Sequence, residues 1–256
     1  MEAIGATKYK TMNTIDHNSG FTLVELLVAI LFSAILMGAI YSSYLTQQRS
    51  YVVQEYVTEM QQNIRAALMM LERDIRMAGY DPTRSSSAGF VTNQNFSKGG
   101  SLSETVYTNS SWVAFTADLD DDGTIDLAVE DIDSDGNRDI SEMEQISYRL
   151  NGSNLQRYST VSGIVEWQTI AENLEQLEFN YILVDGSTTT TPNALQLKSI
   201  RAVQVSILGR SGQQDPKFTN NGTTYTTASG AVWGPYNDNF RRRFLVTTIK
   251  CRNMGL

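Results

Sequence analysis

Cysteine and histidine are almost absent from this chain of 256 residues. The single cysteine, Cys251, excludes an internal disulfide bond in any compartment, and we expect it to be a small buried apolar residue. The single histidine, His17, excludes a metal site built from several histidines and disfavours a catalytic dyad based on histidine. The chemistry of the protein must therefore come from other residue types.

Long basic runs are also missing. The chain has 20 Lys and Arg against 28 Asp and Glu, a formal net charge of −8. Nucleic-acid binding needs clustered Lys and Arg, so we do not expect a nucleic-acid partner. We interpret the one short cluster, Arg241–Arg243, as the solvated start of a strand near an acidic loop.

Sequence signatures of enzymes are absent as well. There is no nucleophile elbow, P-loop, glycine-rich dinucleotide turn or Cys-x-x-Cys pair. Acidic residues are plentiful, so their number alone leaves a hydrolase with paired carboxylates open, but nothing in the pattern places two of them across a cleft. We predict that the protein is not an enzyme.

One long hydrophobic run dominates the N-terminal part of the chain. From Phe21 to Tyr41 it has no Lys, Arg or Asp, and its length is about the 20 residues that span a bilayer as a helix. A secretory signal peptide would have a shorter apolar region followed by a small-x-small cleavage site. We therefore predict a retained membrane helix over about 21–41; the alternative is a buried core helix, which is seldom apolar on all sides for this length.

Glu25 is the only charged residue in this run. A carboxylate within an apolar segment costs on the order of a few kcal/mol unless it is paired, which makes Glu25 a candidate functional residue. Its place near the start of the run also allows the side chain to reach water at the interface. The physical argument leaves both interpretations open.

Beyond Tyr41 the pattern becomes that of an amphipathic helix. No Gly or Pro interrupts residues 39–78, Gly79 offers a C-cap, and Pro82 cannot continue a helix. We predict one helix over 21–80, whose first half needs lipid or other helices and whose second half needs a sheet. Its apolar residues recur every three or four positions, at Val53, Val57, Met60, Ile64, Ala67, Leu71, Ile75 and Ala78.

Residues 81–256 have the composition of a β-rich body, so the predicted fold class is α+β: a long N-terminal helix, with a membrane-spanning first half, packed on an antiparallel β-sheet. Asn151-Gly152 is a favourable hairpin turn. Two polar stretches, Ser85–Gly100 and Gln213–Asn239, are predicted surface loops. Strands are predicted near Thr105–Ala117, Gln145–Leu150, Asn154–Ser159, Leu174–Val184, Ile200–Leu208 and Phe244–Cys251.

An aspartate-rich insertion over about 118–142 suggests a cofactor, calcium, because calcium prefers six to eight oxygen ligands and alternate positions of a tight loop can point carboxylates inward. The second half of the insertion matches the pattern D-x-[DN]-x-[DN]-G-x5-E. Its candidate ligands are Asp131, Asp133, Asp135, Asn137, Asp139 and Glu142. The candidate ligands in the first half are Asp118, Asp120, Asp122, Thr124 and Asp126.

The first of these loops is incomplete. Its twelfth position is Val129, where the pattern has a glutamate. Glu130 or Asp131 could substitute, although Asp131 would then be shared with the second loop. The flanks look like strands, so we expect calcium loops inserted between strands and ordered by the ion; the alternative is a solvated acidic turn.

The segment Gly20-Phe21-Thr22-Leu23-Val24-Glu25 resembles the cleavage and methylation signature of type IV prepilins and pseudopilins. The resemblance implies that residues 1–20 are a leader peptide and that a prepilin peptidase cuts after Gly20 and methylates the new amino group of Phe21. It further implies that Glu25 pairs with the N-terminal amine of a neighbouring subunit in a filament. Such a partner would satisfy the buried carboxylate.

Three further segments, Met70–Tyr80, Arg201–Arg210 and Asn239–Asn253, resemble PilW-type minor pilins. The resemblance implies the pilin fold and a subunit that primes assembly of a bacterial type IV pilus and caps it, serving adhesion and twitching motility. Implied partners are other minor pilins, the major pilin, the prepilin peptidase, the inner-membrane assembly platform and a tip adhesin.

The same resemblance implies a location. Before assembly the chain would lie in the bacterial inner membrane with its body in the periplasm, and after assembly it would lie in the extracellular pilus, at the tip. Two alternatives stay open: a pseudopilin of a type II secretion system, and a calcium-dependent adhesive module carried on a pilin stem.

Overall fold

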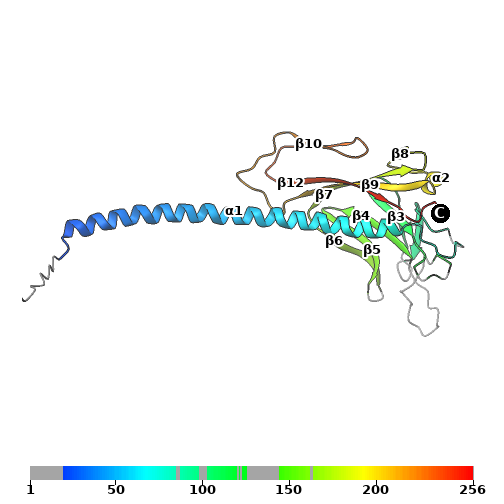
Figure 1. Ribbon diagram of the computed structural model, residues 1–256, viewed down its shortest axis with the longest axis horizontal. Coiled ribbons are helices and arrows are strands. Elements are labelled where there is room, and N and C mark those ends of the chain that lie inside the picture. Colours follow the sequence, from blue (N-terminus) through cyan, green and yellow to red (C-terminus); the bar gives the residue numbers. More distant parts are fainter. Residues whose placement is uncertain are drawn as a thin grey trace, which may run out of the picture. The chain divides into compact units, whose positions relative to one another are not determined.

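A computed structural model describes residues 20–84, 87–97, 103–119, 121, 123–125, 144–161 and 164–255. The chain divides into two compact units, Met1–Tyr51 and Val52–Leu256. Helix α1, Leu23–Met77, supplies most of the described part of the first unit and the first element of the second (Figure 1).

In the first unit, α1 contains the hydrophobic run. By length and composition this helix can cross a membrane, and its apolar stretch is not buried inside protein. Every residue from Gly20 to Tyr44 is exposed, including Leu31, Phe32 and Ile35 at about 60%. A surface this apolar calls for lipid or other helices around it, as the sequence pattern predicts.

The helix ends where the sequence places its stop signal. Gly79 adopts a left-handed conformation with φ of +74°, which a residue with a side chain disfavours. The N–H of Tyr80 donates to the carbonyl of Met77 at 2.9 Å, and the N–H of Gly79 donates to the carbonyl of Thr116 at 3.0 Å. The predicted helix over 21–80 is therefore close to the observed Leu23–Met77.

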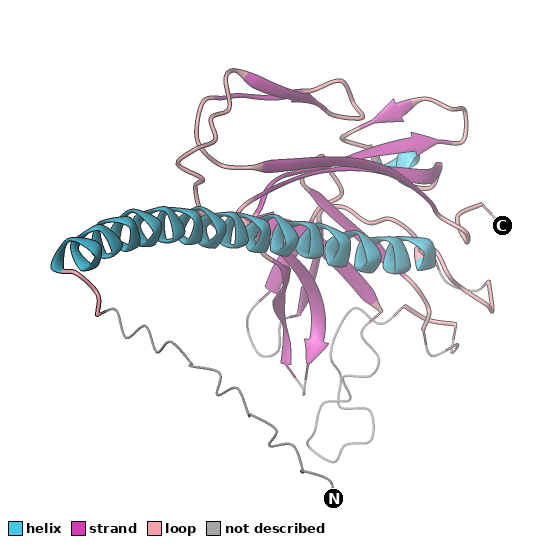
Figure 2. Ribbon diagram, turned by 60° about the vertical axis from the view of Figure 1, so that its left-hand side comes forward, coloured by secondary structure: helices cyan, strands magenta, loops and turns pink. Residues whose placement is uncertain are grey.

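Two four-stranded antiparallel sheets form most of the second unit (Figure 2). One has the order β12-β9-β7-β8 and the other the order β3-β4-β5-β6. The first sheet contains β7 (Leu174–Leu183), β8 (Thr188–Thr189), β9 (Ile200–Arg210) and β12 (Arg242–Lys250). The second contains β3 (Trp112–Thr116), β4 (Gln145–Asn151), β5 (Asn154–Val161) and β6 (Ile164–Ala171).

Two hairpins and a short helix complete the second unit. One hairpin pairs β1 (Gln94–Ser97) with β2 (Ser103–Val106), and the other pairs β10 (Thr223–Thr226) with β11 (Val232–Tyr236). Helix α2 (Ala194–Leu197) precedes β9, and its N-terminus is capped by a capping box between Asn193 and Gln196.

The core of the second unit lies between the apolar stripe of α1 and both sheets. Met60, Ile64, Ala67, Leu71 and Ile75 are all at most 4% exposed, and they share one cluster with side chains from β3, β4, β5, β7, β9 and β12. The predicted stripe is thus the face that packs. The helix and β9 approach closely at Gly209, where an added Cβ would lie 2.6 Å from Cδ1 of Ile64.

The predicted strands are confirmed for β4, β5, β7, β9 and β12 within a few residues at each end. The single predicted strand Thr105–Ala117 is wrong, because a turn separates β2 from β3. The side chain of Asn109 makes this turn, accepting hydrogen bonds from the N–H groups of Ser111 and Trp112 at 2.9 Å each. The predicted loop Gln213–Asn239 contains the β10–β11 hairpin, and β6 was not predicted.

The packing of α1 predicts unequal effects for two methionines of the same helix. Met60 is 4% exposed and Met69 is 66% exposed. Met60→Ala is expected to lower the free energy of unfolding by about 2–5 kcal/mol through lost burial and a cavity, and Met69→Ala to change it by less than about 0.5 kcal/mol. Chemical denaturation of the detergent-solubilised chain measures both, and equal losses would contradict this packing.

Candidate functional site

The N-terminus of α1 is the first candidate site. Thr22 and Glu25 cap the helix reciprocally: the N–H and the hydroxyl of Thr22 each donate to Oε2 of Glu25 at 2.9 Å, and the N–H of Glu25 donates to Oγ1 of Thr22 at 3.2 Å. This is a capping box, in which a carboxylate satisfies backbone donors that the first turn leaves unpaired.

The capping box revises the sequence argument about Glu25. That argument gave the carboxylate no partner within its own chain, whereas the structure provides two donors from Thr22. The spacing Thr-x-x-Glu is the signal that could have revealed the cap from the sequence. Oε2 makes both of these hydrogen bonds, so the cap accounts for one oxygen of the carboxylate.

Gly20 and Phe21 lie immediately before this cap. Both precede the helix and both are exposed, Phe21 at 88%. An added Cβ at Gly20 would meet nothing within 4 Å. The fold of the described chain therefore places no demand for glycine at this position.

The second candidate site is the start of the aspartate-rich insertion. Asp118 follows β3 and Glu144 precedes β4, and they are 0% and 1% exposed. Of the predicted calcium ligands, only Asp118 and Thr124 belong to the described residues. Asp120, Asp122, Asp126 and the whole second loop, Asp131, Asp133, Asp135, Asn137, Asp139 and Glu142, lie outside them.

Backbone contacts hold Asp118 and Glu144 at the base of this insertion. The N–H of Asp118 donates to the carbonyl of Tyr80 at 2.8 Å, and the N–H of Ala117 donates to the carbonyl of Glu144 at 3.0 Å. The N–H of Leu119 donates to Oε1 of Glu144. Within the described ranges, no group of three or more His, Cys, Asp or Glu side chains is arranged to hold a metal ion.

A buried charge network links α1 to the second sheet. Asp74 of α1 is 4% exposed and accepts hydrogen bonds from the hydroxyl of Tyr148 at 2.6 Å, from Nε of Arg157 at 2.7 Å and from Nε of Arg73 at 2.7 Å. Burial opposes its ionisation, but the hydrogen bonds and the charge of Arg157 prevail and lower the pKa of Asp74. Burial and the charge of Asp74 raise the pKa of Tyr148.

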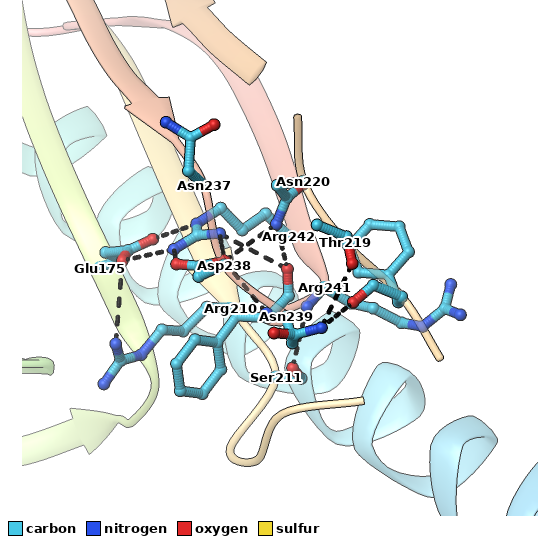
Figure 3. Close-up of polar contacts among 12 residues, drawn as sticks. Glu175, Arg210, Ser211, Thr219, Asn220, Asn237, Asp238, Asn239, Arg241 and Arg242 are labelled. Carbon is cyan, nitrogen blue, oxygen red and sulfur yellow. Dashed lines mark hydrogen bonds and ion pairs between the residues drawn. The ribbon is translucent and has the colours of Figure 1, made fainter. Parts of the chain in front are cut away.

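A second network surrounds Arg242 at the start of β12 (Figure 3). Its side chain is 1% exposed. Nε and Nη2 donate to the carboxylate of Glu175 at 2.5 and 2.9 Å, and Nη1 and Nη2 donate to that of Asp238 at 2.6 and 2.7 Å. The hydrogen bonds from Arg242 hold the pKa of Asp238 far below its usual value. The guanidinium also lies 3.9 Å from the ring centroid of Tyr236.

This network corrects the prediction for Arg241–Arg243. Arg243 is exposed, as expected, but Arg242 is buried, and Arg241 is paired with Asp215 at 2.7 Å. Glu175 and Asp215 lie far from this cluster in the sequence, so the local pattern did not reveal them, whereas Asp238 is only four residues before Arg242. Cys251 is buried as expected, and burial raises the pKa of its thiol to about 12.

These features together define a type IV pilin-like protein: an exposed apolar helix with a Gly-Phe-Thr-Leu-Val-Glu start, continuing into an antiparallel β-sheet body. The chain belongs to the family described as prepilin peptidase-dependent protein B, which it matches over residues 54–228. Residues 15–41 match the prokaryotic N-terminal methylation motif, a range that includes Gly20, Phe21 and Glu25.

Comparison with solved structures finds the type IV-like pilin TTHA1219 from Thermus thermophilus, with 13% sequence identity and a TM-score of 0.45. The similarity covers 77% of this chain and 98% of that chain. No curated protein sequence matches the chain.

Proposed function

We propose that this protein is a minor pilin that primes assembly of a bacterial type IV pilus and caps it. The observation that carries the proposal is the N-terminal methylation motif over 15–41, which includes the start of α1, where every residue up to Tyr44 is exposed. A side-chain surface of this kind serves as a membrane anchor before assembly and as a packing surface between subunits afterwards.

The proposal specifies the partners and the location. A prepilin peptidase cuts the chain after Gly20, and Glu25 then pairs with the amine of a neighbouring subunit. Other minor pilins, the major pilin, the assembly platform and a tip adhesin are the further partners. The chain begins in the inner membrane with its body in the periplasm and ends at the pilus tip, where it supports adhesion and twitching; it has no enzymatic role.

Calcium stabilisation of the body is part of the same proposal. It is supported by the concentration of acidic residues in one insertion, which repel one another unless a cation is present. Calcium outside the cell would fill even weak sites and would stabilise the folded body by mass action.

An in-frame deletion of the gene tests the proposed function, with the wild-type gene restored in trans as the control. Loss of surface pili and twitching, with type II secretion intact, is the expected result. Loss of secretion with pili retained would instead assign the chain to a pseudopilus. An unprocessed chain beginning at Met1 in purified filaments would contradict both assignments.

A further inference from the structure

Strand β12 forms one border of the first sheet, and one of its two edges is open (Figure 1). Among the described strands it pairs with β9 alone, in an antiparallel register that covers all nine of its residues without a bulge. Such pairing satisfies the backbone on one side of a border strand only. The other edge of β12 therefore presents backbone N–H and C=O groups to its surroundings.

The hydrogen bonds to β9 identify the residues that face the open edge. The N–H of Ser211 donates to the carbonyl of Arg241 at 2.8 Å, just before β12 begins. Just after β12 ends, the N–H of Cys251 donates to the carbonyl of Arg201 at 3.0 Å. Because hydrogen-bonded positions alternate along an antiparallel ladder, the odd-numbered residues of β12 bond to β9. The residues whose backbone groups point outward are Arg242, Phe244, Val246, Thr248 and Lys250.

The other edge strands of the two sheets are short, covered or irregular. β8 has two residues, β3 is bridged by Phe90 on its outer side, and β6 has a register shift in its pairing with β5. Proteins usually protect an edge by such devices or by a proline. β12 has none of them, and Phe244–Ile249 carries no charge. This edge is therefore a suitable template for an added strand.

The exposure of the side chains shows which part of the edge a partner can reach. The ring of Phe244 packs against two rings of the β10–β11 hairpin, at centroid distances of 5.5 and 5.8 Å. Beyond it, Val246 is 46% exposed, and Thr248 and Lys250 are exposed as well. The accessible edge thus runs from Val246 to the end of the strand.

The residues around this edge are basic. From residue 239 to 256 the chain has no Asp or Glu, and its basic residues there are Arg241, Arg242, Arg243, Lys250 and Arg252. The first two are paired with acids of the same chain, whereas the last three are exposed and form no ion pair with a described residue. Pairing between two copies of β12 would bring like charges together, which disfavours it. An acidic strand would neutralise them instead.

We propose that the open edge of β12 binds an extended acidic segment of another protein chain as an added strand. Main-chain hydrogen bonds to the outward-facing residues supply the affinity, and the acidic side chains pair with Arg243 and Lys250. A segment of about seven residues is long enough to follow Phe244–Lys250. The surface belongs to the body of the protein, so it would serve a subunit of a pilus or of a pseudopilus.

Fluorescence anisotropy with a labelled peptide tests the surface on the full chain in detergent, with micelles alone as the blank. The probe is the peptide EVTVTVE, and its counterpart of opposite charge is KVTVTVK. The acidic peptide is expected to bind saturably and at least tenfold more tightly than the basic one, with a smaller difference at high salt. Absence of saturable binding by EVTVTVE, or equal binding of both peptides, would overturn the proposal.

Two replacements of Val246 test the backbone contact. Val246→Pro removes an outward N–H that β9 does not use, and proline is tolerated in an edge strand at such a position. It should weaken binding of EVTVTVE at least tenfold while the melting temperature stays close to that of the wild type. Val246→Thr keeps the N–H and should bind as the wild type does. Equal binding by the two variants would show that the backbone of β12 is not the contact.

Methylated peptides provide a test that leaves the protein unaltered. In an added strand, alternate N–H groups point toward β12 and the others point away from it. Two versions of EVTVTVE, N-methylated at either the odd or the even positions, should therefore differ at least tenfold in affinity, with one of them close to the unmethylated peptide. Equal affinities of the two versions would contradict strand addition.

Reversing one charge tests the choice of an acidic partner. Lys250→Glu leaves the backbone of β12 unchanged, and it should weaken EVTVTVE at least tenfold and strengthen KVTVTVK. Arg65→Glu, at an exposed position of α1, makes the same change in net charge away from the strand and is the matched control. Equal effects of the two replacements would show that net charge, and not the edge of β12, selects the peptide.

Discussion

Replacing Gly20 by valine is expected to leave the chain uncut and to abolish its incorporation into pili. The prepilin peptidase is proposed to cut after this residue, within the matched methylation motif, and a branched side chain there would obstruct the backbone at the scissile bond. Mass spectrometry of the purified chain should find the leader still attached, where the wild type begins at methylated Phe21. The effect is close to all or none, because an uncut leader blocks the amine that Glu25 is proposed to pair with.

The structure indicates that Gly20→Val would affect recognition by the peptidase and not the fold of the chain. An added Cβ at Gly20 meets nothing within 4 Å, so the described fold accepts a larger residue there. Gly38 has equally open surroundings within α1, and Gly38→Val is the matched control that should be processed normally. Normal cleavage of the Gly20→Val chain would show that the cut falls elsewhere.

Replacing Arg242 by methionine is expected to lower the free energy of unfolding by roughly 3–5 kcal/mol, the typical cost of removing one partner of a buried ion pair. Methionine retains much of the apolar length but removes the guanidinium that makes four hydrogen bonds to Glu175 and Asp238. The two carboxylates would then lose the guanidinium that they share, and Glu175 would keep only Arg210, whose Nη1 lies 3.8 Å away. Chemical denaturation monitored by tryptophan fluorescence measures the loss.

The adjacent Arg243 provides the control for this measurement. Arg243→Met makes the same replacement at an adjacent position. Because the side chain of Arg243 is exposed, the free energy of unfolding should change by less than about 0.5 kcal/mol. The double replacement of Glu175 and Asp238 by Gln and Asn in the Arg242→Met background should recover part of the loss, because it removes the remaining charges. Equal effects at Arg242 and Arg243 would contradict the buried network.

Elements governed by local patterns were predictable from the sequence. The apolar residues of α1 recur at helical intervals over many turns, and Gly79 ends the helix by adopting a conformation that few other residues accept. The turn at Asn151-Gly152 likewise follows from the two residues themselves, with Gly152 at φ of +61°. The cleavage and methylation signature is also local, since it occupies six adjacent residues.

Contacts between residues distant in the sequence were not predictable in this way. Nothing local indicated that Glu144 would meet the loop beginning at Asp118, because that depends on the register of β3 against β4. In the sequence, Asp74 lies beside the apolar stripe of α1 and resembles a solvated residue. In the structure, Tyr148 and Arg157 from the second sheet form hydrogen bonds with it. The turn at Asn109 was missed because its flanking residues continue a strand-like pattern.

The sequence by itself therefore determined the membrane-suited helix, the amphipathic stripe that continues it, the processing signature and the β-rich character of the body. Each depends on residues that are close together in the sequence. The regular geometry of a helix or strand fixes where such residues lie relative to one another. Only the tertiary structure decided that Arg242 is buried between two acids and that Asp118 and Glu144 share one loop base. Sheet register and strand order bring these groups together, and the free energy of a buried charge depends on such neighbours rather than on the residue itself.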